Sequence, residues 1–110
     1  HQKENMLDAL KNLFSSSVDY KELVDQGAII LDVRSAGEFQ SGHINGAMNI
    51  AVNELEGKLD RLPNKEIPII TCCASGMRSG SAKTLLLAKG YKAVYNGGGW
   101  MSLNKKLQTH

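Results

Sequence analysis

The sequence predicts one α/β domain: a small central parallel sheet with helices on both faces. Apolar stretches short enough to be strands alternate with stretches of helical periodicity, and strands joined through helices pair in parallel by right-handed crossovers. The chain has 110 residues, which suits one compact domain. No internal repeat or low-complexity tract interrupts the alternation.

An amphipathic helix is expected near the N-terminus. Apolar residues recur at helical spacing over residues 3–14, and the run Ser15–Ser17 then breaks the pattern. We therefore divide the chain into an N-terminal helical extension, residues 1–16, and the α/β domain, residues 17–110.

The first half of the domain should hold two strands and two short helices. Asp19 can cap a helix over Tyr20–Asp25. The continuous apolar run Ala28–Val33 is typical of a strand buried on both faces. A short helix over Glu38–Gln40 and a brief strand over Ala47–Ile50 follow.

The second half continues the alternation. A helix is expected over Glu54–Leu62, whose leucines share one face, and a second buried strand over Ile67–Cys72. A strong helix over Ser79–Lys89 should end at Gly90. The remaining elements are a strand over Ala93–Tyr95, a turn over Asn96–Gly99 and a closing helix over Met101–Leu107.

Charge is unevenly distributed along the chain, although its formal net value is only +2. Residues 1–66 carry seven basic and eleven acidic side chains, a balance of −4, whereas residues 67–110 carry six basic side chains and no acidic one, a balance of +6. Such asymmetry can mark an anionic partner. Because aromatic residues make up 5% and the positive charges are sparse, we expect no nucleic-acid partner.

Membrane and metal classes are disfavoured as well. No apolar run approaches the ~20 residues of a membrane span, and residues 1–14 lack a signal-peptide pattern, so we expect no membrane partner and a cytoplasmic location. Cys72 and Cys73 are adjacent, so they fit neither a disulfide framework nor the usual spacing of zinc ligands. We expect no metal and no cofactor.

The stretch 69–79 indicates chemistry, because a buried strand leads through a short loop into a helix. Cys73 falls at the carboxyl end of the strand, where ligands bind in open α/β sheets. Four residues separate it from Arg78, and Gly76 permits the backbone geometry that so tight a loop needs. Amides of the loop and of the helix start favour an anion and stabilise a thiolate. We predict that Cys73 is a nucleophile.

Three ordered blocks resemble the rhodanese family of sulfurtransferases. The loop resembles that family's active-site pattern Cys-x-x-Gly-x-Arg-Ser, filled here by Cys73, Gly76, Arg78 and Ser79. Upstream, Asp32–Ile50 resembles its first signature, and downstream, residues 90–99 resemble its third. Together the blocks cover most of residues 28–103.

The resemblance implies a ping-pong sulfur transfer. The Cys73 thiolate would attack the outer sulfur of a donor such as thiosulfate, release sulfite, and pass its persulfide sulfur to cyanide or a thiol acceptor. The implied partners are a small anionic sulfur donor and a thiol or cyanide acceptor, which can be a protein. The implied substrate-binding residues are Ala74, Ser75, Gly76, Met77, Arg78 and Ser79.

Two other functions stay open. A sulfur-carrier or interaction module would hold the same persulfide but turn over little without its partner protein. Related cysteine-dependent phosphatases and arsenate reductases use a loop one residue longer, and the four residues 74–77 favour sulfur over a larger oxyanion.

The first signature contains four residues for which we expect structural support rather than catalysis. Asp32 and Arg34 should form an ion pair or anchor a loop, and Glu38 can pair with an arginine. His43 should be a hydrogen-bonded structural histidine.

Several loop positions leave alternatives. Arg78 either binds the anionic group of the donor or turns inward and braces the loop. Cys72 should be a small buried hydrophobe that points away from Cys73, with a resolving thiol as the alternative. The neutral side chains of Ala74 and Met77 weaken the expectation of a thiosulfate preference.

Overall fold

The structure of the chain, a computed structural model, describes residues 18–108. The helix expected over residues 3–14, and with it the extension over residues 1–16, lies outside the described residues. The division of the chain at residue 17 therefore stays a prediction.

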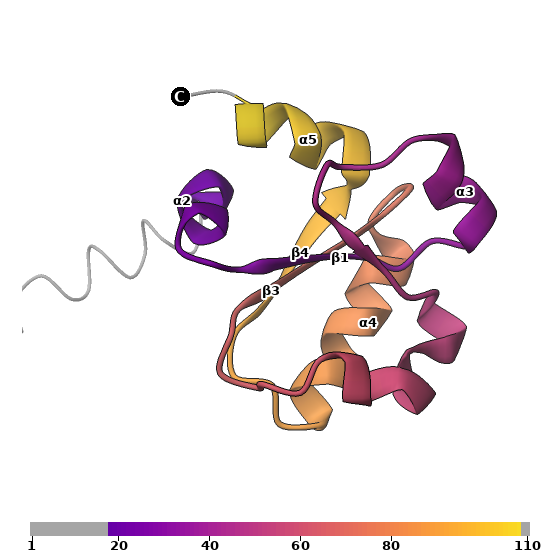
Figure 1. Cartoon of the computed structure of the whole chain (residues 1–110), viewed down its shortest axis with the longest axis vertical. Coiled ribbons are helices and arrows are strands. Elements are labelled where there is room, and N and C mark those ends of the chain that lie inside the picture. Colours follow the sequence, from indigo (N-terminus) through magenta and orange to yellow (C-terminus); the bar gives the residue numbers. More distant parts are fainter. Residues whose placement is uncertain (1–17, 109–110) are drawn as a thin grey trace, which may run out of the picture.

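A four-stranded parallel sheet in the order β2-β1-β3-β4 forms the centre of the domain (Figure 1). Its strands are β1 (Ile29–Asp32), β2 (Met48–Asn49), β3 (Ile69–Cys73) and β4 (Val94–Gly99). The inner strands β1 and β3 are buried almost throughout, which explains why their sequences are apolar runs without alternation. The predicted α/β class is confirmed.

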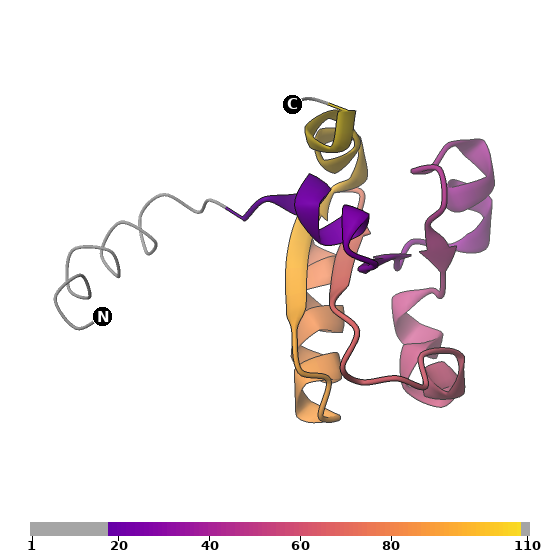
Figure 2. The same cartoon turned by 60° about the vertical axis from the view of Figure 1, so that its left-hand side comes forward.

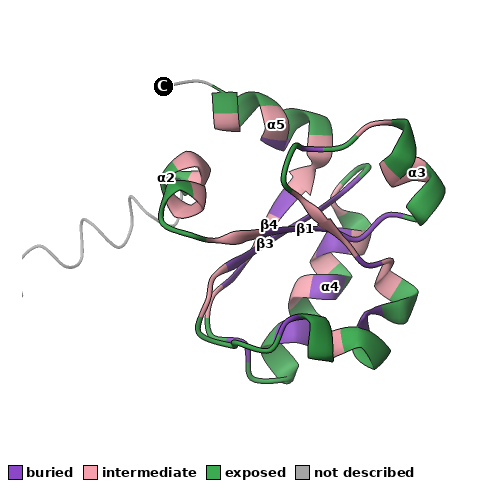
Figure 3. Cartoon of the chain, viewed as in Figure 1, coloured by how far each residue is buried: buried purple, intermediate pink, exposed green. Residues whose placement is uncertain are grey.

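Helices cover both faces of this sheet, as predicted (Figures 1 and 2). The helices of the described residues are α2 (Tyr20–Asp25), α3 (Ala36–Ser41), the 3-10 helix η2 (Val52–Arg61), α4 (Met77–Ala88) and α5 (Trp100–Gln108), and all but α3 pack on the sheet. One core lies between the sheet and the pair α4 and η2, and the other between the sheet and the pair α2 and α5. The buried residues line the strands and the inner sides of the helices (Figure 3).

Alternation along β3 places the two cysteines in different cores. Cys73 joins the cluster beneath α4 and η2, whereas Cys72 joins the cluster beneath α2 and α5. Both are free thiols. The prediction that Cys72 is buried and points away from Cys73 is thus confirmed.

Side-chain caps begin two of the helices. Asp19 accepts a hydrogen bond from the backbone N–H of Glu22 at 3.0 Å, and so begins α2 as predicted. Ser35 and Glu38 form a capping box at the start of α3, in which each side chain satisfies a backbone N–H of the other. The box holds the Glu38 carboxylate in a defined position.

The helix expected over Glu54–Leu62 is present but belongs to a different class. It is a 3-10 helix that begins two residues earlier, and its backbone leaves helical geometry at Lys58 (φ −124°). Asn53, Gly57 and Asp60 are weak α-helix formers, so burial of the leucines, rather than propensity, holds the segment in place.

The turn expected over Asn96–Gly99 is wrong, because β4 continues through Gly99. The strand pairs with β3 as far as Gly99 opposite Cys73, with an irregularity in register just before. A Cβ on Gly97 would lie 2.9 Å from side-chain atoms of Ile70 and Leu103. The glycines therefore allow a close approach of elements and do not reverse the chain.

Two boundaries near the predicted nucleophile also differ from expectation. Cys73 is the last residue of β3 instead of the first residue of a loop, and α4 begins at Met77 instead of Ser79. The connection between strand and helix is therefore only Ala74–Gly76, which tightens the predicted loop.

Candidate active site

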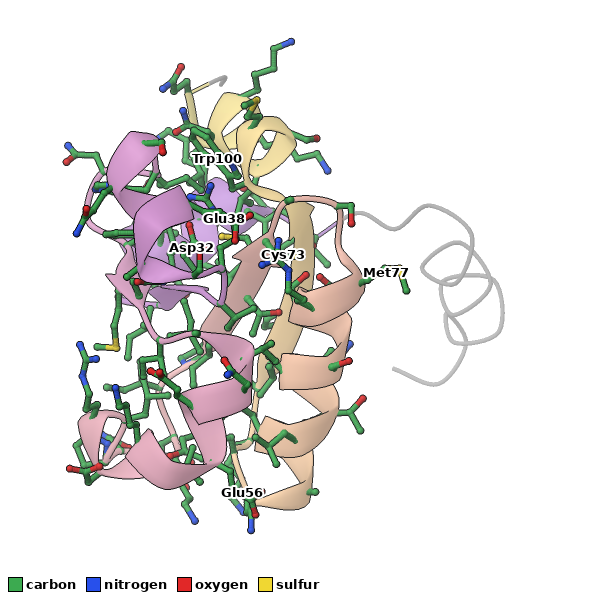
Figure 4. The ribbon with its side chains drawn as sticks, turned by 90° about the vertical axis from the view of Figure 1, so that its right-hand side faces the viewer. Asp32, Glu38, Glu56, Cys73, Met77 and Trp100 are labelled. Atoms are coloured by element: carbon green, nitrogen blue, oxygen red, sulfur yellow. The ribbon has the colours of Figure 1, made fainter. Side chains whose placement is uncertain are left out.

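The candidate site lies at the carboxyl end of β3, between α3 and the first turn of α4 (Figure 4). Cys73 is buried there, beneath its own loop. Gly76 caps α4 in the left-handed region (φ 101°), which glycine adopts without steric cost. This conformation turns the loop back over the sulfur.

Three hydrogen-bonding groups converge on the Cys73 sulfur. The backbone N–H of Gly76 donates to Sγ at 3.0 Å and that of Ser79 at 3.4 Å, while the Ser79 hydroxyl oxygen lies 3.4 Å away. Both amides belong to the start of α4, where N–H groups have no partner within the helix. The sulfur occupies a position built for negative charge.

The pKa values of the two adjacent thiols are shifted in opposite directions. Burial raises the pKa of Cys73, but the hydrogen bond between its sulfur and the Ser79 hydroxyl, together with those from backbone N–H groups of Ser79, Ser75 and Gly76, outweighs this effect, and the net pKa is lowered. Burial, followed by the charge of Asp32, raises the pKa of Cys72 to about 12. Cys73 is thus the more acidic of the two thiols and the one that forms a thiolate more readily.

Asn96 of β4 is a residue of this site that the sequence analysis missed. Its side-chain Oδ1 accepts hydrogen bonds from the Ser79 hydroxyl at 2.7 Å and from the Gly98 N–H at 2.9 Å, and its Nδ2 donates to the Gly76 carbonyl at 3.2 Å. The amide thereby fastens the loop and the first turn of α4 to β4. An asparagine directly before three glycines suggested a turn, so the sequence pattern misplaced it.

Arg78 and Glu38 form a two-pronged ion pair across the site. The Arg78 Nη atoms lie 2.8 Å and 3.0 Å from the two Glu38 carboxylate oxygens. Hydrogen bonds from Arg78, followed by the bond from the Ser35 backbone, lower the pKa of Glu38 to about 2. The arginine thus ties the first turn of α4 to α3.

Asp32 and Arg34 form a second, buried ion pair at the end of β1. Arg34 Nη2 lies 2.7 Å from an Asp32 carboxylate oxygen and also donates to the Gly42 carbonyl at 2.7 Å. Its guanidinium lies 4.8 Å from the centre of the Trp100 ring. These contacts join β1, the loop after α3 and the start of α5. The pair therefore supports the segments around the site without facing the Cys73 sulfur.

His43 is bound within its own segment. Its Nδ1 lies 2.6 Å from the Phe39 carbonyl oxygen, and its ring stacks on the Phe39 ring with centroids 3.7 Å apart. These contacts suit the structural role expected from the sequence.

The outer face of the loop is uncharged. Ala74 and Ser75 are exposed, and the Met77 side chain, 79% exposed, points away from the sulfur into solvent (Figure 4). Of the predicted loop residues, Ser75, Gly76 and Ser79 therefore contribute groups to the sulfur, whereas the side chains of Ala74 and Met77 form its surroundings.

Within residues 18–108, no group of three histidine, cysteine or acidic side chains is placed to hold a metal ion. In the same part of the chain, no helix is both long and apolar enough to cross a membrane.

Comparison with known proteins gives consistent matches. The family model described as a rhodanese-like domain matches residues 16–106. Thiosulfate sulfurtransferase PspE of Escherichia coli is 36% identical over 70 residues, covering 63% of this chain and 67% of its own. Thiosulfate sulfurtransferase GlpE of Haemophilus influenzae is 33% identical over 92 residues. This match covers 80% of this chain and 87% of the Haemophilus protein. The structure of the human single-domain sulfurtransferase TSTD1 superposes with a TM-score of 0.70 at 31% identity. The superposition covers 79% of this chain and 90% of the human chain.

Proposed function

The chain belongs to the rhodanese-like domain family, and from this premise we propose that it is a thiosulfate sulfurtransferase that carries sulfur on Cys73. The observation that supports this most directly is the convergence of the Gly76 and Ser79 donors on the Cys73 sulfur. A lowered thiol pKa and a cradle of amides are what a nucleophile that alternates between thiolate and persulfide requires.

The proposed reaction has two steps. The Cys73 thiolate attacks the outer sulfur of thiosulfate, a new S–S bond forms, and the old S–S bond breaks as sulfite leaves with the bonding electron pair. A cyanide ion or an acceptor thiolate then attacks the outer sulfur of the persulfide, and Cys73 leaves as a thiolate. The loop amides stabilise the negative charge on sulfur in both steps.

The uncharged outer face of the loop favours a second candidate, a sulfur carrier that serves a protein acceptor. Met77 is 79% exposed at the edge of the site, and exposed apolar side chains suit contact with another protein better than contact with a small anion. Under this alternative, release of sulfur to cyanide is slow and release to a protein thiol is fast.

The unpaired state of both cysteines suits a reducing compartment, and we include a cytoplasmic location in the proposal.

Mass spectrometry of the intact protein tests the proposal. Incubation with thiosulfate followed by desalting should add about 32 Da, one sulfur atom, to the protein and to the Cys72→Ser variant, but not to Cys73→Ser. Subsequent cyanide should remove the added mass. If none of several sulfane donors adds mass to the protein, or if Cys73→Ser gains as much, the proposal fails.

A further inference from the structure

Arg78 is the one charged side chain among residues 72–79, and its guanidinium is already engaged in an ion pair with Glu38. Both of its Nη atoms donate to the Glu38 carboxylate, one to each oxygen. A planar guanidinium can bind one carboxylate or one sulfonate through this pair of donors. An anion that approaches the loop therefore finds these two donors already in use.

Glu38 is held in the position from which it engages Arg78. Its Oε1 accepts hydrogen bonds from the Ser35 N–H and hydroxyl, both at 3.0 Å, as part of the capping box of α3. Because α3 fixes the carboxylate independently of Arg78, little conformational freedom is lost when the ion pair forms.

Arg78 lies within electrostatic range of the nucleophile. The charge of the Cys73 thiolate contributes to the raised pKa of Arg78, after the larger contribution of Glu38. The ion pair joins α3 to the first turn of α4, which follows directly on the loop that carries the Gly76 donor. When Cys73 attacks the outer sulfur of a donor, the anionic end of that donor lies near the loop. The Arg78 guanidinium is the positive charge there that can bind this anionic end.

We infer that Glu38 is a specificity-determining residue, which competes with anionic sulfur donors for Arg78 and so weakens the binding of a dianion such as thiosulfate. The inference rests on the proposed function. It assigns donors without a sulfonate, such as persulfides of thiols, an advantage that they would lose without Glu38. Glu38 touches neither the reacting sulfur nor the bond that breaks, so its effect falls on binding and leaves the chemical step intact.

Glu38→Gln isolates this effect. Glutamine is accepted at this position of a capping box, so α3 keeps its cap, while a neutral amide binds a guanidinium more weakly than a carboxylate does. We expect the KM for thiosulfate to fall about three- to tenfold and kcat to change by less than about twofold.

Glu56→Gln is the matched control. It changes the net charge by the same amount, but Glu56 pairs with Lys89 at 2.9 Å, at the far end of α4 from Cys73 (Figure 4). Its KM should equal that of the unmodified protein. An equal fall in KM for Glu56→Gln would assign the effect to overall charge and overturn the inference.

A chemical readout does not depend on sulfur transfer. Iodoacetate is an anion and iodoacetamide is neutral, so the ratio of their rates of Cys73 alkylation reports how well the site receives an anion. This ratio should rise about three- to tenfold in Glu38→Gln, and the rise should disappear in the double variant Glu38→Gln/Arg78→Gln. A rise of the same size in the double variant would show that Arg78 is not the contested group.

The two arms separate failure of the inference from failure of the proposed function. An unchanged alkylation ratio in Glu38→Gln, together with normal sulfur transfer, overturns the inference alone. A raised ratio in a protein that accepts no sulfur from any donor supports the competition for Arg78 and rejects the sulfurtransferase.

Discussion

Cys72 and Cys73 differ in acidity because one step along a strand changes everything that surrounds the sulfur. Cys73 faces amides at the start of α4, whereas Cys72 lies among apolar side chains beneath α5, close to the charge of Asp32. Hydrogen bonds to a thiolate favour ionisation, and burial without such bonds opposes it. Only one of two chemically identical groups is thereby activated.

Ser79→Ala should make the Cys73 thiol less acidic. The hydrogen bond with the Ser79 hydroxyl is the largest of the influences that lower the pKa of Cys73, so its loss should raise that pKa. The pH profile of alkylation by iodoacetamide should shift upward, and the rate at pH 7 should fall severalfold.

Ser81→Ala is the control for that variant, since Ser81 is an exposed serine on the same helix. Its profile should match that of the unmodified protein. If the pH profiles of Ser79→Ala and Ser81→Ala coincide, the Ser79 hydroxyl does not lower the pKa of Cys73.

Cys72 should produce a loss of stability at alkaline pH. Its pKa is about 12 in the folded protein and ~8.5 in an unfolded chain. Between these values the unfolded chain releases a proton that the folded protein retains, so the free energy of unfolding decreases as pH rises above about 8.5. Urea unfolding between pH 8 and pH 10 should show this slope, and Cys72→Ala should flatten it. An identical slope in the variant would contradict the assignment.

At the scale of elements, β4 shows how packing overrides local sequence. Three consecutive glycines favour a turn, yet the strand continues because neighbouring atoms leave no room for a side chain at Gly97. The same close approach brings Asn96 against the loop. The position of an active-site residue thus depends on glycines that have no chemistry of their own.

Gly97→Ala should destabilise the fold. The added Cβ would lie 2.9 Å from side-chain atoms of Ile70 and Leu103 and 3.0 Å from the Thr71 carbonyl oxygen, and overpacking of a core costs about 1–3 kcal/mol. Urea unfolding measures the loss. Gly57→Ala in η2 is the control, because nothing lies within 4 Å of a Cβ there, and its free energy of unfolding should change little. A Gly97→Ala variant as stable as the control would show that β4 can move away.

Elements and contacts that depend on local sequence could be predicted, and those that depend on distant partners could not. The apolar runs of β1 and β3 and the periodicity of α4 carry their own signals, as does the cysteine loop. The partner of Arg78 lies 40 residues upstream and that of Ser79 lies 17 residues downstream. No spacing rule links such positions, so Asn96 was missed and the role of Arg78 stayed open.

At the scale of the whole molecule, the charge asymmetry has an internal explanation. Residues 1–66 are acidic overall and residues 67–110 basic, and ion pairs join the two parts: Arg78 with Glu38, and Lys89 with Glu56. Some of the excess charge of each part is therefore neutralised across the fold. The basic half is in part the complement of the acidic half, and less an anion-binding surface than its sequence suggested.

The buried pair of Asp32 and Arg34 joins β1, the loop after α3 and the start of α5, and its removal should reduce the stability of the whole domain. Asp32 is fully buried and Arg34 is 4% exposed. Arg34→Ala would leave the Asp32 carboxylate buried without its counter-ion, and such a change costs about 3–5 kcal/mol, a large part of the ~5–15 kcal/mol that stabilises a typical domain.

The double variant Arg34→Ala/Asp32→Asn should recover part of this loss, because no uncompensated charge remains and the asparagine oxygen can still accept the backbone N–H that Asp32 accepts at 3.0 Å. Urea unfolding followed by far-UV circular dichroism measures both variants, and Trp100 fluorescence reports the site locally, since the guanidinium lies 4.8 Å from that ring. A double variant less stable than Arg34→Ala would mean that the Asp32 carboxylate stabilises the fold even without its arginine, through its bond to the backbone.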